Sequence, residues 1–426
     1  MFHRHNDDLI WGWVSSPNSR GSINIIYSNL VTIYLCSWTS LCLNFPRPGE
    51  ERGWRFLWYK FRWQLITIFF PEVVAVTAAE QWLSACQSVK TFATMGHKEW
   101  TVRHGFFADM GGIKVAPPDM PPFPVDSHQL AFLVKNGHLP MPRITTADIC
   151  ALNKADGLAR ILTLIQMAWF CLSCIGRGVG RIGLSPLELT TLALILCTLH
   201  NYFFWYFKPL DPQRLEILTM DIPIAQVRRI AGVEGSQLHS PLGFVNPPPD
   251  PKSLVTPFWF GVKLVFSPRE KLDQGQIQAL PNTGIRPPEG VSWGMMLYLL
   301  FFSMAYYALH ATMGFMVGFP STFEWYLWTV SNFADIGLIT LYCLSIPVGT
   351  YYAPSIGKRW FRKQASSVLD LASMLPCWAK LLVHGPFVFA YVAARTIVLT
   401  VSFISLRALP AQLYQDVNWS GILPHI

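Results

Sequence analysis

The sequence FFPEVVAVTAAEQW at residues 69–82 contains two carboxylates, Glu72 and Glu80. It belongs to a longer apolar stretch, residues 62–83, which is long enough to cross a membrane. An ionisable side chain in a membrane helix costs at least about 2.5 kcal/mol, so such residues tend to face a protein interior and to serve a function. Glu72 follows Pro71, and a proline inside a helix kinks it and frees a backbone carbonyl. Glu80 is expected about 80° around the helix and about 12 Å further along it. Both carboxylates can therefore line one cavity, but they cannot form an acid dyad.

Each of these carboxylates also has a structural interpretation. Glu80 stands beside Gln81 and Trp82, which favours a side chain that reaches the membrane interface near a helix end. For Glu72 two interpretations stay open: a proton donor, or a carboxylate paired with a buried arginine or tyrosine.

A third carboxylate, Asp109, lies in a predicted loop with the sequence WTVRHGFFADMGGI at residues 100–113. An aromatic pair precedes it and a Met-Gly-Gly turn follows it, which indicates a partly apolar setting that raises the pKa of the carboxyl group. A carboxyl group needs a raised pKa to act as a general acid near neutral pH. The alternative is an aspartate that accepts hydrogen bonds within the turn, and the sequence leaves both open.

Four further polar residues fall on predicted helices in the C-terminal half. Asn332 and Asp335 are three residues apart on one helix face, and Tyr306 and His310 are four residues apart on another. These side chains could meet in one pocket. They could also satisfy one another as a buried network between helices, which is the favoured account for any one of them.

Motifs for several common reactions are absent from the sequence. It has no DDxxD or DxDD run, no paired HxxxH and HxxHH set, no GxSxG elbow and no phosphate-binding loop. The nine cysteines are scattered, so neither a disulfide framework nor a zinc site is indicated. We therefore expect no metal and no cofactor. An enzyme of this kind would donate a proton in an apolar, aromatic cavity, where each ring face stabilises a carbocation by about 0.5–2 kcal/mol.

The composition indicates a membrane protein. Hydrophobic residues make up 51% of the 426 residues and charged residues only 14%, whereas soluble domains carry about 25% charged residues. The net charge of +8 is spread over loops and forms no basic stripe with interleaved aromatic residues. The pattern therefore indicates a lipid bilayer as partner and no nucleic acid.

Seven apolar stretches are close to the roughly 20 residues that a helix needs to cross a bilayer. Each is expected to be a helix, because lipid offers backbone groups no other hydrogen-bond partner. The predicted fold class is all-α, a polytopic bundle of seven transmembrane helices that forms a single domain over residues 1–426. The stretches are 23–45, 62–83, 158–176, 184–206, 292–317, 323–350 and 381–404.

Two long polar connections, 84–157 and 207–291, are expected to be capping loops, because the proline clusters APPDMPPFP and NPPPDP cannot continue a helix. The second contains VTPFWFGVKLVF at 255–266, which is too short to span and is predicted to be interfacial or re-entrant. The segments 46–61 and 351–380 are both basic, yet five predicted spans separate them. Either one basic segment faces the other side or an eighth span is hidden in a long connection, so the orientation stays open.

Several stretches resemble a family of fungal multi-pass membrane proteins whose characterised members look like membrane-bound terpene cyclases of the ascofuranone and macrophorin meroterpenoid pathways. The resemblance covers residues 23 to about 212 and is thin afterwards. The chain departs from the family's pattern at Cys42, where the pattern carries a histidine, and at the glycine-rich turn GRGVGR. The stretches are INIIYSNLVTIYLCSWTSLCLNFPRP, FFPEVVAVTAAEQW, WTVRHGFFADMGG and KADGLARILTLIQMAWFCLSCIGRGVGRIGLSPLELTTLALILCTLHNYFFWYFKPLDP.

The resemblance implies cyclisation of a farnesyl chain attached to an aromatic or cyclohexenone head group, started by protonation of a terminal epoxide or alkene without a metal. Some acids fit the shared stretches and are candidate catalytic residues, and a second set of residues is predicted to line the substrate cavity. The candidate acids are Glu72, Glu80, Asp109, Asp156 and Glu188. The predicted substrate-binding residues are Trp169, Phe204, Trp205, Tyr306, His310, Asn332 and Asp335.

The resulting prediction is a multi-pass terpene cyclase of the endoplasmic reticulum membrane that acts on a prenylated small molecule, with Asp109 or Glu72 as general acid. Residues 1–22 have no apolar signal-peptide core, so the first span is expected to act as an uncleaved signal-anchor. One alternative is a proton-coupled small-molecule transporter or export factor that uses Glu72, Asp335 and His310. Another is a membrane isomerase or hydrolase of a fungal secondary-metabolite pathway.

Overall fold

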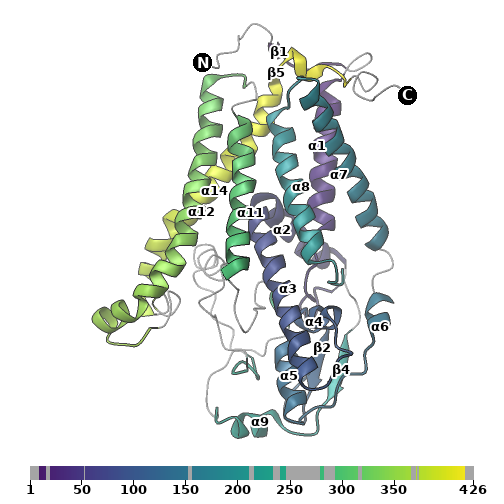
Figure 1. Cartoon of the computed structure of the whole chain (residues 1–426), viewed down its shortest axis with the longest axis vertical. Coiled ribbons are helices and arrows are strands. Elements are labelled where there is room, and N and C mark those ends of the chain that lie inside the picture. Colours follow the sequence, from purple (N-terminus) through teal and green to yellow (C-terminus); the bar gives the residue numbers. More distant parts are fainter. Residues whose placement is uncertain are drawn as a thin grey trace.

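The computed structural model describes residues 9–15, 20–51, 53–151, 156–210, 215–233, 240–245, 279–282, 293–314, 319–365, 371 and 374–417. The described chain is mostly helical. Long helices pack side by side in the upper part of Figure 1, and short helices and strands lie below them.

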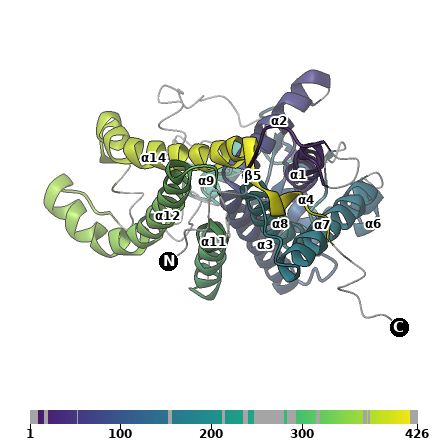
Figure 2. The ribbon, with the colours of Figure 1, turned by 90° about the horizontal axis from the view of Figure 1, so that it is seen from above.

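The long helices form one bundle in which α8 is central. Seen from above, α11, α12 and α14 lie on one side of α8, and α1 and α7 lie on the other (Figure 2). The sequence marks the start of α8 clearly, since Ser185 accepts a hydrogen bond from the N–H of Glu188 and Pro186 occupies the first turn. The bundle helices are α1 (Ser22–Thr39), α7 (Asp156–Val179), α8 (Pro186–Phe204), α11 (Trp293–Gly314), α12 (Thr322–Ile356) and α14 (Cys377–Ile404).

Each of the seven predicted stretches overlaps one helix or, for 62–83, two helices, but fewer of these helices qualify as membrane spans. Within the described residues, four helices are long and apolar enough to cross a membrane, or up to five if a bent pair counts as one span. In α11 only the shorter apolar segment Leu297–Ala311 stands out, and α1 is not among the candidates. The four are Gly157–Val179, Pro186–Phe204, Thr322–Ser345 and Trp378–Arg407.

The stretch 62–83, which we expected to be one span kinked at Pro71, consists of two helices. These are α2 (Gly53–Phe69) and α3 (Pro71–Thr94), and they are bent by 109° where they meet. Pro71 is the first residue of α3, where its missing N–H costs nothing, so no proline lies inside this helix. The expectation of a kinked helix is therefore wrong, and Glu72 stands at a helix N-terminus.

The predicted capping loop 84–157 is largely folded, and the all-α prediction is incomplete there. It begins within α3 and continues into short helices and strands that form, with β4 and α9, a unit that we call the cap. Its sheet has the order β3-β2-β4, with β2 antiparallel to β3 and parallel to β4. The cap elements are α4 (Val102–Asp109), β2 (Ile113–Ala116), β3 (Phe123–Pro124), α5 (Ser127–Lys135), α6 (Thr146–Ala151), β4 (Glu216–Thr219) and α9 (Ile224–Ile230).

At the opposite end of the molecule, β1 (Leu9–Trp11) pairs antiparallel with β5 (Ala408–Pro410) (Figure 1). The second predicted loop, 207–291, is described only in part, and its segment 255–266 lies outside the described residues. Single-turn elements complete the chain: η2 (Gly357–Phe361) continues α12, η3 (Ser405–Arg407) continues α14, and η4 (Ala411–Tyr414) follows β5.

Helix α3 joins the bundle to the cap because its two halves belong to different apolar cores. Val73, Val74 and Ala78 pack in a cluster with residues of α8 and α11. Phe92, near the other end of α3, packs with Trp100 in the core of the cap. A shift of α3 would therefore disturb both units.

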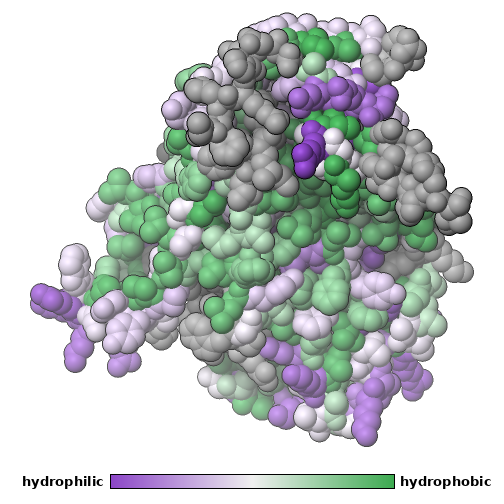
Figure 3. Space-filling model, turned by 45° about the horizontal axis from the view of Figure 1, so that its top comes forward, coloured by the Kyte–Doolittle hydropathy of each residue, from purple (hydrophilic) through white to green (hydrophobic). Residues whose placement is uncertain are grey.

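Apolar side chains cover much of the middle of the face shown in Figure 3, and hydrophilic side chains gather near its top, near its bottom and at the projection on the left. On α7, several large apolar side chains are exposed, which is the pattern of a helix in contact with lipid. They include Leu158, Ile161, Leu162, Ile165, Leu172 and Ile175.

Candidate functional site

Glu72 stands in the first turn of α3 because Pro71 starts this helix. The N-terminus of a helix has unpaired N–H groups and about half a positive charge, and both attract a carboxylate. The Glu72 side chain is only 2% exposed. Its Oε1 accepts a hydrogen bond of 2.8 Å from the hydroxyl of Tyr307 on α11. Its Oε2 has no partner among the described residues, so one oxygen of this buried carboxylate is free.

A fully buried arginine on α14, Arg395, completes the surroundings of Glu72. Its Nη2 donates to the hydroxyl of Tyr306, and its Nε donates to the backbone carbonyl of Phe69 at 3.2 Å. The hydroxyl of Tyr391 lies 3.0 Å from that of Tyr307. Because the one hydroxyl hydrogen of Tyr307 is donated to the carboxylate, Tyr391 is the donor in this pair. We call this set the Glu72 cluster: Glu72, Tyr306, Tyr307, Tyr391 and Arg395.

Of the four polar residues predicted on α11 and α12, Tyr306 belongs to this cluster, and the other three are buried on the same two helices. The ring centroids of Tyr306 and His310 are 4.9 Å apart. Trp328 of α12 donates its indole N–H to the backbone carbonyl of His310, and the amide nitrogen of Asn332 donates to the carbonyl of Trp328. Asp335 is fully buried, and both of its oxygens lack a partner among the described residues.

The guanidinium group of Arg395 therefore interacts electrostatically with two buried carboxylates, Glu72 and Asp335. Because a buried unpaired charge is very costly, a site with two carboxylates and one cation is expected to hold one additional proton. This arrangement can store and release a proton inside an apolar bundle.

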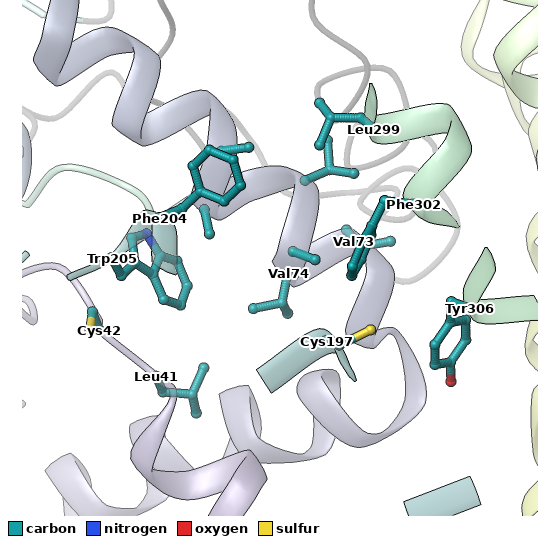
Figure 4. Packing of buried hydrophobic residues seen from close by; sticks show 14 of the residues in the cluster. Leu41, Cys42, Val73, Val74, Cys197, Phe204, Trp205, Leu299, Phe302 and Tyr306 are labelled. Carbon is teal, nitrogen blue, oxygen red and sulfur yellow. The ribbon is translucent and has the colours of Figure 1, made fainter. Parts of the chain in front are cut away.

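Phe204 and Trp205, two predicted substrate-binding residues, are buried in the same apolar cluster as Tyr306. In Figure 4 they lie on the far side of Val74 from Tyr306. The indole N–H of Trp205 donates to Oε1 of Gln81 at 3.0 Å. These aromatic rings are therefore interior, and their role in substrate binding stays a prediction.

The prediction that Trp169 lines an interior cavity is wrong. Its side chain is 60% exposed and stands on the outer face of α7. The inner face of this helix carries Met167, Phe170 and Cys174, which pack against α1 and α8. Trp169 is thus placed to contact lipid rather than a substrate.

The prediction that Glu80 reaches an interface near a helix end is also wrong, because α3 continues to Thr94 and the Glu80 side chain is only 4% exposed.

The Glu188 side chain caps the start of α8. Its carboxylate accepts hydrogen bonds from the N–H and the hydroxyl of Ser185 and forms an ion pair with Arg20. Asp156 is the first residue of α7, and its side chain lies outside the described part of the chain.

Asp109 is the last residue of α4 and is 1% exposed. Its carboxylate links α4 to α3 and α5 by hydrogen bonds. Its Oδ1 accepts the backbone N–H of Ser127, the first residue of α5, at 2.8 Å. Its Oδ2 accepts the hydroxyl of Ser84 on α3 at 3.0 Å, and that hydroxyl in turn accepts from Nε2 of His128 at 3.0 Å. Burial raises the pKa of the Asp109 carboxyl to about 6, although His128 acts in the opposite direction. Both sequence interpretations thus hold in part, since the pKa is raised and both oxygens accept hydrogen bonds.

Glu72 and Asp109 occupy separate sites. Ser84, which contacts Asp109, is twelve residues beyond Glu72 on α3, or about 18 Å along the helix. Glu72 is therefore no direct support of Asp109. The two carboxylates also differ in chemistry, because Asp109 has both oxygens occupied by donors, which favours a carboxylate, whereas Glu72 has one oxygen free.

Sequence reasoning did not select Arg395, Tyr307 or Tyr391. Arg395 lies inside the predicted span 381–404, and an ionisable residue in such a stretch is itself a functional signal. The two tyrosines carried no comparable signal, because tyrosine is common in membrane helices and only the packing of α11 and α14 shows which hydroxyl is buried.

A fourth residue that sequence reasoning missed is Lys208, which follows α8 and is almost completely buried. Its ammonium donates to Oε1 of Gln81 at 2.8 Å and to Oδ1 of Asn44 at 3.2 Å. Burial lowers the pKa of Lys208 to about 8. Nearby, the sulfur of Cys42 accepts a hydrogen bond of 2.9 Å from Nη2 of Arg160.

The raised pKa of Asp109 predicts how stability depends on pH. Because its pKa is higher in the folded protein than in the unfolded chain, Asp109 contributes stability below about pH 4 that is lost as the pH rises through 6. The loss corresponds to about 3 kcal/mol. We expect Asp109→Asn, which stays neutral, to gain thermal stability relative to the unmodified protein as the pH rises from 4 to 8. Thermal unfolding in detergent measures this difference.

Asp119 provides a control, because its replacement is expected to change the pH dependence of stability in the opposite direction. Although its partial burial acts in the other direction, hydrogen bonds from the N–H groups of Ala225 and Ile224 hold the pKa of Asp119 below its usual range. Asp119→Asn should therefore lose stability relative to the unmodified protein as the pH rises towards about 4, and the difference should stay constant from pH 4 to 8. Parallel pH profiles for Asp109→Asn and the unmodified protein would contradict the assignment of a raised pKa.

The fold and the sites define a mostly helical protein in which four described helices are long and apolar enough to cross a membrane, with carboxylates buried between helices. The chain belongs to a family of unknown function, DUF8562, whose profile matches residues 3–225, a little over half of its length. No curated protein and no solved structure matches it. The matched region contains Glu72 and Asp109, whereas Tyr307 and Arg395 lie beyond it.

Proposed function

We propose that the protein is an integral membrane terpene cyclase that starts the reaction by proton transfer, with Glu72 as the general acid. Its substrate is a prenylated aromatic or cyclohexenone compound whose farnesyl chain ends in an epoxide or an alkene. The endoplasmic reticulum is the expected membrane. The substrate class comes from the sequence resemblance, and the choice of acid comes from the geometry of the Glu72 cluster.

The observation that carries the proposal is the asymmetry of the Glu72 carboxyl group. Oε1 accepts a hydrogen bond from Tyr307, and Oε2 has no partner among the described residues. In the protonated acid the hydrogen therefore resides on Oε2, free to be transferred to a substrate. The hydrogen bond from Tyr307 to Oε1 stabilises the carboxylate that remains after the proton is transferred.

Arg395 supports the same step. It lies within electrostatic range of Glu72, so its charge stabilises the carboxylate left behind when the proton departs. Electrostatic interactions of this kind are stronger in an apolar interior than in water. The hydrogen bonds of Arg395 to Tyr306 and to the Phe69 carbonyl hold the guanidinium group in place.

The side chains around Glu72 suit a carbocation. Phe70 stacks on Tyr391 with ring centroids 5.5 Å apart, and Phe302 and Tyr306 belong to the adjoining apolar cluster. Ring faces stabilise cations and offer no strong nucleophile that would capture them. A cyclisation cascade needs both properties.

Turnover in a membrane preparation tests the proposal. Microsomes containing the protein are given a farnesyl meroterpenoid or its terminal epoxide, and products are analysed by mass spectrometry and NMR. A cyclised product, of unchanged mass or with one added water, is expected from one of the two substrates. No product from either substrate would count against the proposal.

The Glu72 cluster also favours a second candidate function, a proton-coupled transporter. Asp335 is fully buried with both oxygens unpaired among the described residues, and it shares Arg395 with Glu72. Two carboxylates that share one cation can exchange a proton during transport. Proton-dependent uptake into vesicles that is lost in Glu72→Gln would favour this candidate, whereas a cyclase turns over in detergent, where no gradient exists.

A further inference from the structure

The imidazole of His310 presents a bare nitrogen to the interior of the bundle. His310 is fully buried on α11, and its Nδ1 lies 3.2 Å from the backbone carbonyl oxygen of Tyr306. Because a carbonyl oxygen only accepts, Nδ1 carries the hydrogen, and the neutral ring has its lone pair on Nε2. Nε2 is buried and has no partner among the described residues.

The ring that carries this nitrogen packs against Tyr306 of the Glu72 cluster. The His310 ring packs between Tyr306 and Trp328, with centroid distances of 4.9 Å and 6.1 Å. The hydroxyl of Tyr306 is held by Arg395, which in turn acts on Glu72. An unpaired buried polar group costs about 1–3 kcal/mol, so its presence next to a proton donor calls for a function.

We infer that His310 is the base that ends the cyclisation by removing a proton from the carbon next to the last carbocation. This inference rests on the proposed function and adds its final step. The Glu72 proton moves to the epoxide oxygen or the alkene carbon, and the resulting cation is attacked by the next double bond, which forms a carbon–carbon bond. At the end a C–H bond breaks, its electron pair forms a double bond, and the proton binds Nε2 of His310.

The inference fixes the class of product. One proton enters the substrate from Glu72 and one leaves to His310, so the product is an isomer of the substrate with a new carbon–carbon double bond. Return of the proton from the imidazolium group to the Glu72 carboxylate resets the site. Capture of the last cation by water would instead add one water to the mass.

His310→Asn removes the basic nitrogen and retains the local hydrogen bond. An asparagine can make this bond, because Asn332 donates its side-chain amide to the carbonyl four residues before it at 2.8 Å. Substrate consumption should fall by less than about tenfold, since Glu72 still starts the reaction. The ratio of alkene to hydrated product should fall by at least about tenfold, because a positioned base contributes about 10²- to 10⁴-fold to its step.

Trp328→Phe is the matched control, since it removes the hydrogen bond to the His310 carbonyl and keeps the imidazole. It should leave the product ratio unchanged. His310→Gln is a second variant without a basic nitrogen and should repeat the shift seen in His310→Asn. An unchanged ratio in both His310 variants, or a hydrated compound as the main product of the unmodified protein, would overturn the inference. Failure of the proposed function would look different, because the unmodified protein would then form no cyclised product.

Discussion

Glu72→Gln is expected to reduce cyclisation by about 10²- to 10⁴-fold, the usual contribution of a general acid. Glutamine has the same shape and can still accept the hydrogen bond from Tyr307, but it carries no transferable proton at the position of Oε2. Asp109→Asn should retain most of the activity, because Asp109 lies in a separate site between α3, α4 and α5. Initial rates of product formation, measured with purified protein in detergent, compare the two variants directly.

Glu80→Gln is the matched control for the loss of a buried carboxylate from α3. Glu80 is buried on the same helix, about 12 Å from Glu72 along its axis. Its replacement should change stability without a comparable loss of turnover. If Asp109→Asn abolishes the reaction and Glu72→Gln does not, the general acid is Asp109 and the present assignment is wrong.

Replacement of Arg395 is expected to have the second largest effect, on both stability and turnover. Arg395→Met leaves the Phe69 carbonyl and the Tyr306 hydroxyl without their donor, and leaves two buried carboxylates without a cation. Breaking a buried charge pair by removing one partner costs about 3–5 kcal/mol. We expect a marked drop in the unfolding temperature and a loss of turnover of about 10²-fold or more.

Two further variants separate the charge of Arg395 from its hydrogen bonds. Arg395→Lys keeps the charge but not the fork that reaches Phe69 and Tyr306, so it should recover part of the stability. Combining Arg395→Met with Glu72→Gln removes one charge of each sign and should be less destabilising than the sum of the single changes. Additive effects on unfolding would show that Arg395 and Glu72 do not interact.

The helical part of the fold could be predicted from the sequence because its signals are local. A long apolar segment predicts a helix, because in lipid its backbone groups can only pair with one another. All seven predicted stretches overlap helices in the structure. The same rule does not decide which helices cross a membrane, since α3 continues beyond the apolar stretch into the cap. The proline before Glu72 was informative, but it marks the start of a helix and not a kink.

The cap could not be predicted in the same way, because its sheet depends on contacts between distant residues. Strand β2 pairs with β4, and Lys114 lies opposite Ile217 although about a hundred residues separate them. Short strands of four residues carry little periodic signal, and the nearby prolines suggested irregular loops. Pairing between such segments is decided by the packing of α3, α4 and α5 around them.

The sequence by itself determined which residues are chemically unusual, because a carboxylate in an apolar stretch is costly wherever the chain folds. Glu72 and Asp335 were selected on this ground, Asp109 was selected for its aromatic neighbours and its glycine turn, and all three are buried. Only the tertiary structure decided which partners each one has, since the partners of Glu72 are Tyr307 and Arg395, more than two hundred residues away. Hydrogen bonds and charges act over a few ångströms in space, and a linear pattern does not record which helix faces meet.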